Sequence, residues 1–187
     1  MKDSSQSKEL LKAAQIINSG GVVIFPTDTV YGIGAKFNDS EAVERIYKIK
    51  GTQKTQPFPV LVSGVSQAQK IVTMNETAKR LAKKYWPGAL TIIGKAKDGS
   101  GKVGVRQPDH IAPLTIIKES GTPIIGTSAN FHGQKAPSNM GDLDLQLAKL
   151  ADFVVLGECK NEGESTVVDT TVDPPKILRL GAVKLDL

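Results

Sequence analysis

The stretch Gly20-Gly21-Val22-Val23-Ile24-Phe25-Pro26-Thr27-Asp28-Thr29-Val30-Tyr31-Gly32-Ile33-Gly34 carries the main information about the fold. Its first half, 20–25, is a short apolar and β-branched run, which predicts a strand buried on both faces. Pro26 then removes a ladder donor, and Gly32 and Gly34 allow backbone geometry or a close approach that other residues resist, so 32–34 is expected to form a turn. Two hydroxyls, a carboxylate and a phenol lie between these breaks, so polar side chains follow a rigid strand, a common location for a ligand site.

A simpler interpretation of residues 26–29 is also open. Pro-Thr-Asp-Thr is typical of a turn whose Thr and Asp side chains cap a following helix, because both accept hydrogen bonds from nearby backbone N–H groups. These four residues do not decide between a local cap and a ligand site. The rest of the chain has to decide.

The composition predicts a single globular domain over residues 1–187, because 40% hydrophobic residues supply one sizeable core. No apolar run approaches the roughly 20 residues that span a bilayer, and the polar N-terminus lacks a signal-peptide apolar region. We therefore expect a cytoplasmic protein without membrane contact. The single cysteine, Cys159, excludes an internal disulfide and fits a reducing compartment. With only His110 and His132 beside it, no metal site is expected.

The charge is unevenly distributed along the chain. The net charge is +5, yet thirteen Lys and Arg stand against two acids, Glu76 and Asp98, between Arg45 and Arg106. The last third is acidic by comparison. This distribution predicts one positive face suited to the phosphates of a nucleotide or of RNA, with solvated lysines on ordinary helices as the alternative.

Hydrophobic periodicity alternates between helical and strand patterns. Helices are expected near 8–18, 40–50, 66–70, 75–84, 112–120 and 142–150, and strands near 20–25, 57–62, 89–93, 102–106, 124–126, 153–156, 165–169 and 176–180. This alternation predicts an α/β layered fold. Several strands are joined too tightly for parallel crossovers, so the sheet is expected to be mixed and twisted.

Many predicted strands end in polar or basic side chains, and these strand ends are expected to converge on one cavity. The residues concerned are Thr27, Thr29, Arg106, Ser128, Asn130 and Arg179. The chain lacks a P-loop, a Gly-x-Gly-x-x-Gly after a strand and a Gly-x-Ser-x-Gly elbow. An enzyme built this way would act on phosphates by positioning and charge neutralisation, without a covalent nucleophile.

Six blocks of sequence follow one another along the chain, at 26–34, 86–91, 105–108, 127–130, 164–169 and 178–181. In order and spacing they resemble the YrdC-like family, whose best-known members are threonylcarbamoyladenylate synthases. The likeness runs from about residue 10 to 183. It implies a single-domain open twisted mixed β-sheet flanked by helices, with a concave positively charged face, in the short form without a C-terminal extra domain.

The resemblance also implies a reaction. L-threonine, bicarbonate and ATP, the last carrying Mg²⁺, would give threonylcarbamoyl-AMP and pyrophosphate, a nucleotidyltransferase reaction. The product would serve N6-threonylcarbamoyladenosine formation at position 37 of tRNA. A partner threonylcarbamoyl transferase complex would complete the modification, and the basic face would contact tRNA or double-stranded RNA.

Site residues follow from the resemblance position by position. Lys50 and Arg106 would be catalytic. The threonine site would contain Thr29, Arg106, Gly126 and Ser165. The ATP site would contain Lys50, Thr52, Lys54, Gln56, Lys102, Ser128, Asn130 and Arg179.

One block departs from the family pattern. Thr52 stands where an arginine is expected to contact the triphosphate, and Leu61 and Ala136 replace side chains that usually offer polar contacts. Two interpretations stay open. The chain is a divergent synthase in which Lys54 or Lys102 supplies the missing charge, or it resembles the YciO branch and binds nucleotide or double-stranded RNA with little synthase activity.

Overall fold

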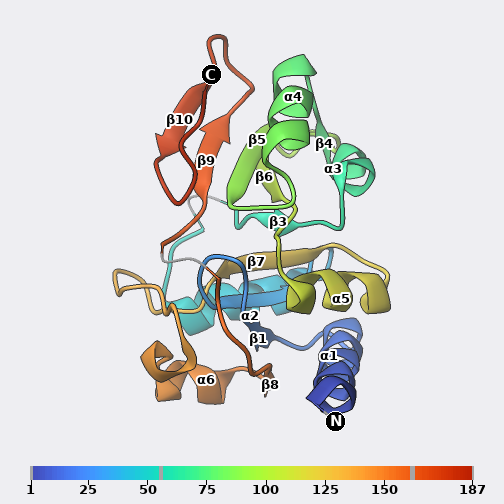
Figure 1. Cartoon of the computed structure of the whole chain (residues 1–187), viewed down its shortest axis with the longest axis vertical. Coiled ribbons are helices and arrows are strands. Elements are labelled where there is room, and N and C mark those ends of the chain that lie inside the picture. Colours follow the sequence, from blue (N-terminus) through green and yellow to red (C-terminus); the bar gives the residue numbers. More distant parts are fainter. Residues whose placement is uncertain (1, 55–56, 161–162, 187) are drawn as a thin grey trace.

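The computed structural model describes residues 2–54, 57–160 and 163–186, with side chains from residue 5 onward (Figure 1). The helices are α1 (Lys2–Asn18), α2 (Ser40–Lys50), α3 (Val65–Ile71), α4 (Glu76–Tyr85), α5 (Ile111–Ser120) and α6 (Leu145–Leu150), with a 3₁₀ turn, η1 (Met140–Asp142). The strands are β1 (Val23–Phe25), β2 (Gly32–Lys36), β3 (Val60–Leu61), β4 (Val72–Thr73), β5 (Leu90–Ala96), β6 (Lys102–Arg106), β7 (Ile124–Ser128), β8 (Phe153–Val154), β9 (Thr166–Asp169) and β10 (Lys176–Arg179).

All ten strands belong to one sheet in the order β10-β9-β5-β6-β3-β7-β2-β1-β8, with β4 paired to β5 outside this path. The pairs β1–β8, β3–β6 and β5–β9 are parallel, and the other pairs are antiparallel. The predicted mixed α/β sheet is therefore confirmed. Figure 1 shows α3 and α4 at one end of the molecule with β9 and β10, and α1, α5 and α6 toward the other end.

Local signals in the sequence explain where the helices begin and end. The carboxylate of Asp39 accepts a hydrogen bond from the Ala42 N–H at 3.0 Å, which caps α2. Gly51 ends the same helix in the left-handed region at φ 62°. Asn75 caps α4 by accepting from the Ala78 N–H at 2.9 Å. No described helix is both long and apolar enough to cross a membrane.

The predicted turn at 32–34 is wrong, because these residues form the start of β2. This strand pairs with β1 on one side and with β7 on the other. A Cβ atom at Gly34 would lie 2.3 Å from the Ile125 carbonyl oxygen and 2.9 Å from the Phe25 ring. Gly34 allows a close approach of neighbouring groups within the sheet. Glycine is also common in turns, so the sequence alone does not distinguish a turn from a closely packed strand.

The helix predicted at 142–150 is also wrong in its first part. The chain forms η1, breaks, and starts α6 only after Asp144, whose carboxylate accepts from the Gln146 N–H at 2.7 Å. Because the Asp144 side chain caps the first turn of α6, the helix begins after this residue and does not extend back to 142. The two-residue strand β4 has no counterpart among the predicted elements.

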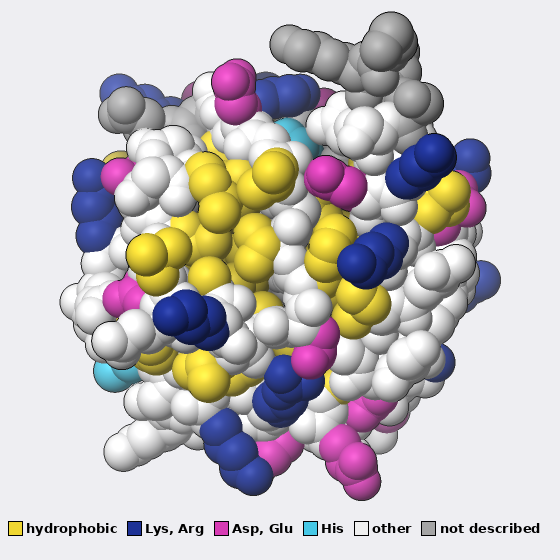
Figure 2. Space-filling view, turned by 90° about the horizontal axis from the view of Figure 1, so that it is seen from below, with side chains coloured by type: hydrophobic (Ala, Val, Ile, Leu, Met, Phe, Trp, Pro, Cys, Tyr) yellow, Lys and Arg dark blue, Asp and Glu magenta, His cyan; other side chains and the backbone are white. Residues whose placement is uncertain are grey.

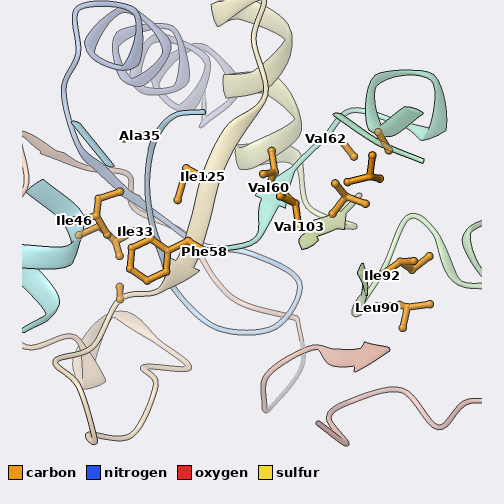
Figure 3. Packing of buried hydrophobic residues seen from close by; sticks show 14 of the residues in the cluster. Ile33, Ala35, Ile46, Phe58, Val60, Val62, Leu90, Ile92, Val103 and Ile125 are labelled. Carbon is orange, nitrogen blue, oxygen red and sulfur yellow. The ribbon is translucent and has the colours of Figure 1, made fainter. Parts of the chain in front are cut away.

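The sheet has apolar side chains on both faces, and successive strand residues alternate between two clusters. Ile24 belongs to the larger cluster. Val60 and Ile125 pack in the same cluster with α2 side chains such as Ile46 (Figure 3). Their neighbours Phe25, Leu61 and Ile124 pack in the second cluster, against α1 and α5. The prediction that β1 is buried on both faces is confirmed, since Val23, Ile24 and Phe25 have no exposed surface.

The face seen from below carries a group of exposed apolar side chains among charged ones (Figure 2). The elements at this end include α1, α6 and β8 (Figure 1). Large exposed apolar side chains in and next to α6 and β8 are Leu145, Leu150 and Leu156. None of these three side chains lines the cleft described below.

Candidate active site

A cleft of about 110 Å³, open to solvent, lies where strand ends gather. Its lining comes from the segment after β1 and from β2, β3, β5, β6, β7, β9 and β10 with their flanking residues. These residues are Thr27, Thr29, Val30, Gly32, Pro59, Leu61, Thr91, Arg106, Gly126, Thr127, Ser128, Glu164, Ser165 and Arg179. The predicted gathering in one cavity is confirmed for Thr27, Thr29, Arg106, Ser128 and Arg179, but Asn130 is not among the lining residues.

Arg106, the last residue of β6, is held by three acceptors. Its Nε donates to the Gly88 carbonyl at 3.0 Å, Nη1 donates to Thr29 Oγ1 at 3.1 Å, and Nη2 donates to Asp28 Oδ1 at 2.6 Å. The Arg106 and Asp28 side chains are only 8% and 2% exposed. Burial lowers the pKa of Arg106 and Asp28 opposes this shift, so the guanidinium stays charged.

The donor count of Arg106 defines what it can bind. A guanidinium has five N–H groups, and the three bonds to described residues leave one on each terminal nitrogen. A guanidinium suits an anion such as a carboxylate, to which it can donate more than one hydrogen bond. Arg106 is therefore a fixed cation at the cleft, with N–H donors left for an anionic ligand.

The hydroxyl of Thr29 is fixed by its neighbour Thr27. Thr27 Oγ1 donates to the Val30 carbonyl at 2.7 Å and accepts from the Thr29 N–H at 3.0 Å. The two hydroxyls lie 3.0 Å apart, so the Thr29 proton points to Thr27. The chain then enters β2 and not a helix, so the helix-capping interpretation of residues 26–29 is wrong.

A second group of polar residues comes from β9 and β10. Arg179 Nη1 lies 2.9 Å from Glu164 Oε2, its Nε donates to the Ser165 carbonyl at 3.0 Å, and its Nη2 donates to Ser165 Oγ at 3.2 Å. Ser165 Oγ is also 2.9 Å from the hydroxyl of Thr91. Two arginines therefore face one cleft, each paired with a carboxylate.

Lys50 is buried behind the end of β7 and does not line the cleft itself. Its ammonium donates to the Ser128 carbonyl, to the Asn130 carbonyl at 2.8 Å and to Asn130 Oδ1 at 3.4 Å. Burial lowers the pKa of Lys50 to about 8, and the carboxylate of Glu164 opposes that shift. The Asn130 amide in turn donates to the Gln134 carbonyl at 2.7 Å, so Asn130 holds the loop that follows β7.

Other predicted ATP-site residues lie apart from the cleft. Thr52 Oγ1 is 3.3 Å from His132 Nδ1, and Lys54 forms an ion pair with Glu44 on α2. Lys102 is 2.8 Å from Asp169 and begins β6, whereas Arg106 ends that strand about 13 Å further on. The structure thus places neither Lys54 nor Lys102 where the missing charge was expected, and Gln56 lies outside the described residues.

The residues that the structure adds to the cleft or its support, and that the sequence did not assign, include Asp28, Thr91 and Glu164. Asp28 lay inside the key stretch, but its partner Arg106 is 78 positions away.

Leu61 does line the cleft, and a Cβ at Gly126 would lie 2.5 Å from its Cδ1. Glycine at 126 is therefore matched to Leu61. Ala136 is not among the lining residues.

Comparisons of the sequence and of the structure with known proteins identify the same family. The family Sua5/YciO/YrdC, described as "Telomere recombination", matches residues 15–181. The threonylcarbamoyl-AMP synthase of Bacillus subtilis is 36% identical over 96% of this chain. A putative threonylcarbamoyl-AMP synthase of Methanocaldococcus jannaschii is 32% identical over 99% of this chain and 91% of that protein.

Two solved structures share the fold. P. abyssi Sua5 complexed with L-threonine has a TM-score of 0.86 and 33% identity over 94% of this chain and 54% of that one. E. coli YciO has a TM-score of 0.83 and 26% identity over 95% of this chain and 91% of that one. The chain spans about half the length of the first two curated synthases it matches, 55% and 54%.

Proposed function

Because this chain belongs to the Sua5/YciO/YrdC family, we propose that it is an L-threonylcarbamoyladenylate synthase. In the proposed reaction, the threonine amine and bicarbonate form a carbamate, in which a C–N bond forms and the oxygen lost from bicarbonate leaves as water. A carbamate oxygen then attacks the α-phosphorus of ATP. One P–O bond forms, the bond to the β-phosphate oxygen breaks, and pyrophosphate leaves. In this proposal the product serves tRNA modification by a separate transferase complex, and both steps take place in the cytoplasm.

The single observation that carries this proposal is the orientation of Arg106 in the cleft. Its three anchored N–H groups fix the guanidinium plane, and its two remaining donors suit the threonine carboxylate. The hydroxyl groups of Thr91 and Ser165 line the same cleft and suit the polar part of a small hydroxy amino acid. Curated relatives named threonylcarbamoyl-AMP synthase and the threonine complex of P. abyssi Sua5 support the same assignment.

The chemistry requires cations where two anions meet. A carbamate that approaches a triphosphate at 4 Å meets a repulsion of about 4 kcal/mol per pair of unit charges at an effective dielectric constant of 20. Arg179 lines the cleft and Lys50 lies directly behind Ser128, so both are placed to offset this repulsion. The proposed role of Lys50 is therefore electrostatic and not nucleophilic.

Mg²⁺ enters this proposal as part of the substrate Mg–ATP. Within 2–54, 57–160 and 163–186, no group of three or more His, Cys, Asp and Glu side chains forms a metal site. The residues therefore fit a metal that is held by the triphosphate itself. Mg²⁺ would neutralise charge on the leaving pyrophosphate.

A second candidate function is nucleotide or RNA binding with little synthase activity. The observation that favours it is the position of the lysines expected to replace the missing arginine, since Lys54 pairs with Glu44 and Lys102 pairs with Asp169. The fold similarity to E. coli YciO is consistent with it. The basic segment 70–102, with eight Lys and Arg against two acids, is where RNA would bind in either case.

The test is pyrophosphate release from Mg–ATP, measured with and without L-threonine and bicarbonate. We expect release that depends on both co-substrates, and a loss of at least a hundredfold in the threonine-dependent kcat/KM for Arg106→Lys, because lysine does not reproduce a bidentate donor pair. Arg80→Lys on the exposed face of α4 is the matched control and should match the wild type. ATP binding without any threonine response would support the binding function instead.

A further inference from the structure

The cleft contains a carboxylate that the reaction described above does not use. Glu164 lines it beside Arg106, Arg179 and Ser165, and its charge reaches Lys50 strongly enough to oppose the lowered pKa of that lysine. A negative side chain weakens the binding of anions nearby. Arg179 is the cationic partner of Glu164 within the protein, and the acceptor sites that this ion pair leaves on the carboxylate suit a cationic ligand group.

The amino acid substrate supplies such a group. At neutral pH an α-amino acid carries a carboxylate and an ammonium on the same carbon, and Arg106 accounts only for the carboxylate. We propose that Glu164 binds the α-ammonium group of the amino acid substrate, an inference that rests on the proposed function. The cleft would then match the zwitterion with one fixed cation and one fixed anion.

The backbone of Glu164 is rigid enough for this role. Its carbonyl accepts from the Ala182 N–H at 2.9 Å, and a Cβ at Gly181 would lie 2.2 Å from the same oxygen, so the two segments are in tight contact. The hydroxyl of the next residue, Ser165, is hydrogen-bonded to the side chains of Thr91 and Arg179. The side chain is oriented by Arg179, and a carboxylate with about four acceptor sites keeps capacity for an ammonium.

A divalent metal is the other cation that a carboxylate in this cleft would attract. The described residues contain no cluster of three ligating side chains. The Arg179 Nη1 atom, 2.9 Å from Glu164 Oε2, would repel a divalent ion bound to that carboxylate. An ammonium carries one charge and donates hydrogen bonds, so it fits beside the guanidinium better than a metal does.

The experiment compares two ligands that differ in the amine alone. L-threonine and (R)-3-hydroxybutanoate share the carboxylate and the hydroxyl, and their affinities are measured by calorimetry without ATP or metal, for the wild type and for Glu164→Gln. Glutamine keeps the size of the side chain and an acceptor for Arg179. Glu76→Gln on α4, which also loses an exposed ion pair, is the matched control.

We expect threonine affinity to fall about ten- to a hundredfold in Glu164→Gln, with 3-hydroxybutanoate affinity unchanged or slightly raised, since only the amine loses its charged partner. Glu164→Asp, which keeps the charge, should retain part of the preference for threonine. Glu76→Gln should behave as the wild type.

Two results would overturn the assignment. An equal loss for both ligands would mean that Glu164 only positions Arg179, and an unchanged threonine affinity, with a defect only when Mg–ATP is present, would assign Glu164 to the metal–nucleotide complex. The proposed function is tested separately by wild-type pyrophosphate release. If the wild type releases no pyrophosphate, the proposed function fails, and the calorimetric comparison of threonine with 3-hydroxybutanoate still decides the role of Glu164.

Discussion

Residue 52 is uncharged at a position where the family resemblance implies an arginine in the ATP site. Thr52 is hydrogen-bonded to His132 at 3.3 Å, and Lys54 is paired with Glu44. A guanidinium at position 52 would add a charged, forked donor to the proposed ATP site. The weakness of the proposed enzyme is therefore expected at the triphosphate and not at the amino acid.

Thr52→Arg is predicted to raise the affinity for Mg–ATP by about tenfold, which corresponds to about 1.4 kcal/mol, and to raise synthase activity. The measurement is the KM for ATP in the pyrophosphate assay. Lys54→Met is the comparison, and it should change the KM little because this lysine is held by Glu44. A Thr52→Arg variant with no gain would speak against a weakened synthase.

Lys50 predicts a pH dependence at the same end of the site. Its pKa is lowered to about 8 by burial, so the ammonium loses its proton as the pH rises through that value. A bound triphosphate favours the protonated form, so Mg–ATP affinity should be highest below pH 8 and fall above it. Calorimetry between pH 7 and 9.5 checks this, with Lys50→Met expected to lose the dependence. An identical pH profile in both proteins would contradict it.

At the scale of single elements, β2 is the strand whose existence depends on glycine. Gly34 allows the Ile125 carbonyl and the Phe25 ring to approach to distances that a side chain would block. The sequence favoured a turn here because glycine serves both purposes, and the strand partners that decide between them come from β1 and from the distant β7.

Gly34→Ala is predicted to destabilise the protein by about 2 kcal/mol or more, because the added Cβ would lie 2.3 Å from a backbone oxygen that cannot move freely. The free energy of urea unfolding measures the effect. Gly64→Ala is the control, since the nearest atom to its added Cβ is 3.9 Å away. Equal stabilities of the two variants would show that β2 and β7 do not pack as described.

The start of α5 carries a second prediction. His110 caps this helix by accepting from the Ala112 N–H with Nδ1, and its Nε2 donates to the Glu158 carbonyl, so the ring is neutral. Burial lowers the pKa of His110 and Asp28 partly opposes the shift. The folded state therefore binds a proton less readily than the unfolded chain, whose histidine titrates near 6.5.

Stability is therefore predicted to be complete above about pH 6.5 and to decrease as the pH falls below it, where the unfolded state binds more protons. His110→Asn keeps a capping side chain but cannot titrate, so its unfolding free energy should vary less between pH 7.5 and 5. Urea unfolding at several pH values makes the comparison. The same slope in both proteins would remove His110 as the cause.

At the scale of the whole molecule, the order of helices and strands was predictable because capping residues, apolar periodicity and short connections are local signals. The gathering of strand ends was also predictable, because ligands bind where such ends meet. The ion pairs that give the site its charge pattern were not predictable from the sequence. Asp28 and Arg106 are 78 positions apart, and Lys102 was assigned to the site although strand direction places it at the other end of β6.

The excess of Lys and Arg over acids is concentrated in one segment of the chain. Segment 70–102 carries eight Lys and Arg against two acids, and the remainder of the chain carries sixteen Lys and Arg against seventeen acids. The net positive charge therefore belongs to the end of the molecule formed by α4 and its neighbouring strands. The cleft itself pairs each of its two arginines with a carboxylate.

The central claim is that one cleft joins threonine, bicarbonate and ATP. The most direct measurement is mass spectrometry of the product formed from ¹³C-bicarbonate, L-threonine and Mg–ATP by the wild type and by Arg106→Lys. The wild type should give a threonylcarbamoyl-AMP that contains the ¹³C atom, and the variant should give almost none. AMP and pyrophosphate formed without ¹³C incorporation, or equal product from both proteins, would contradict the account.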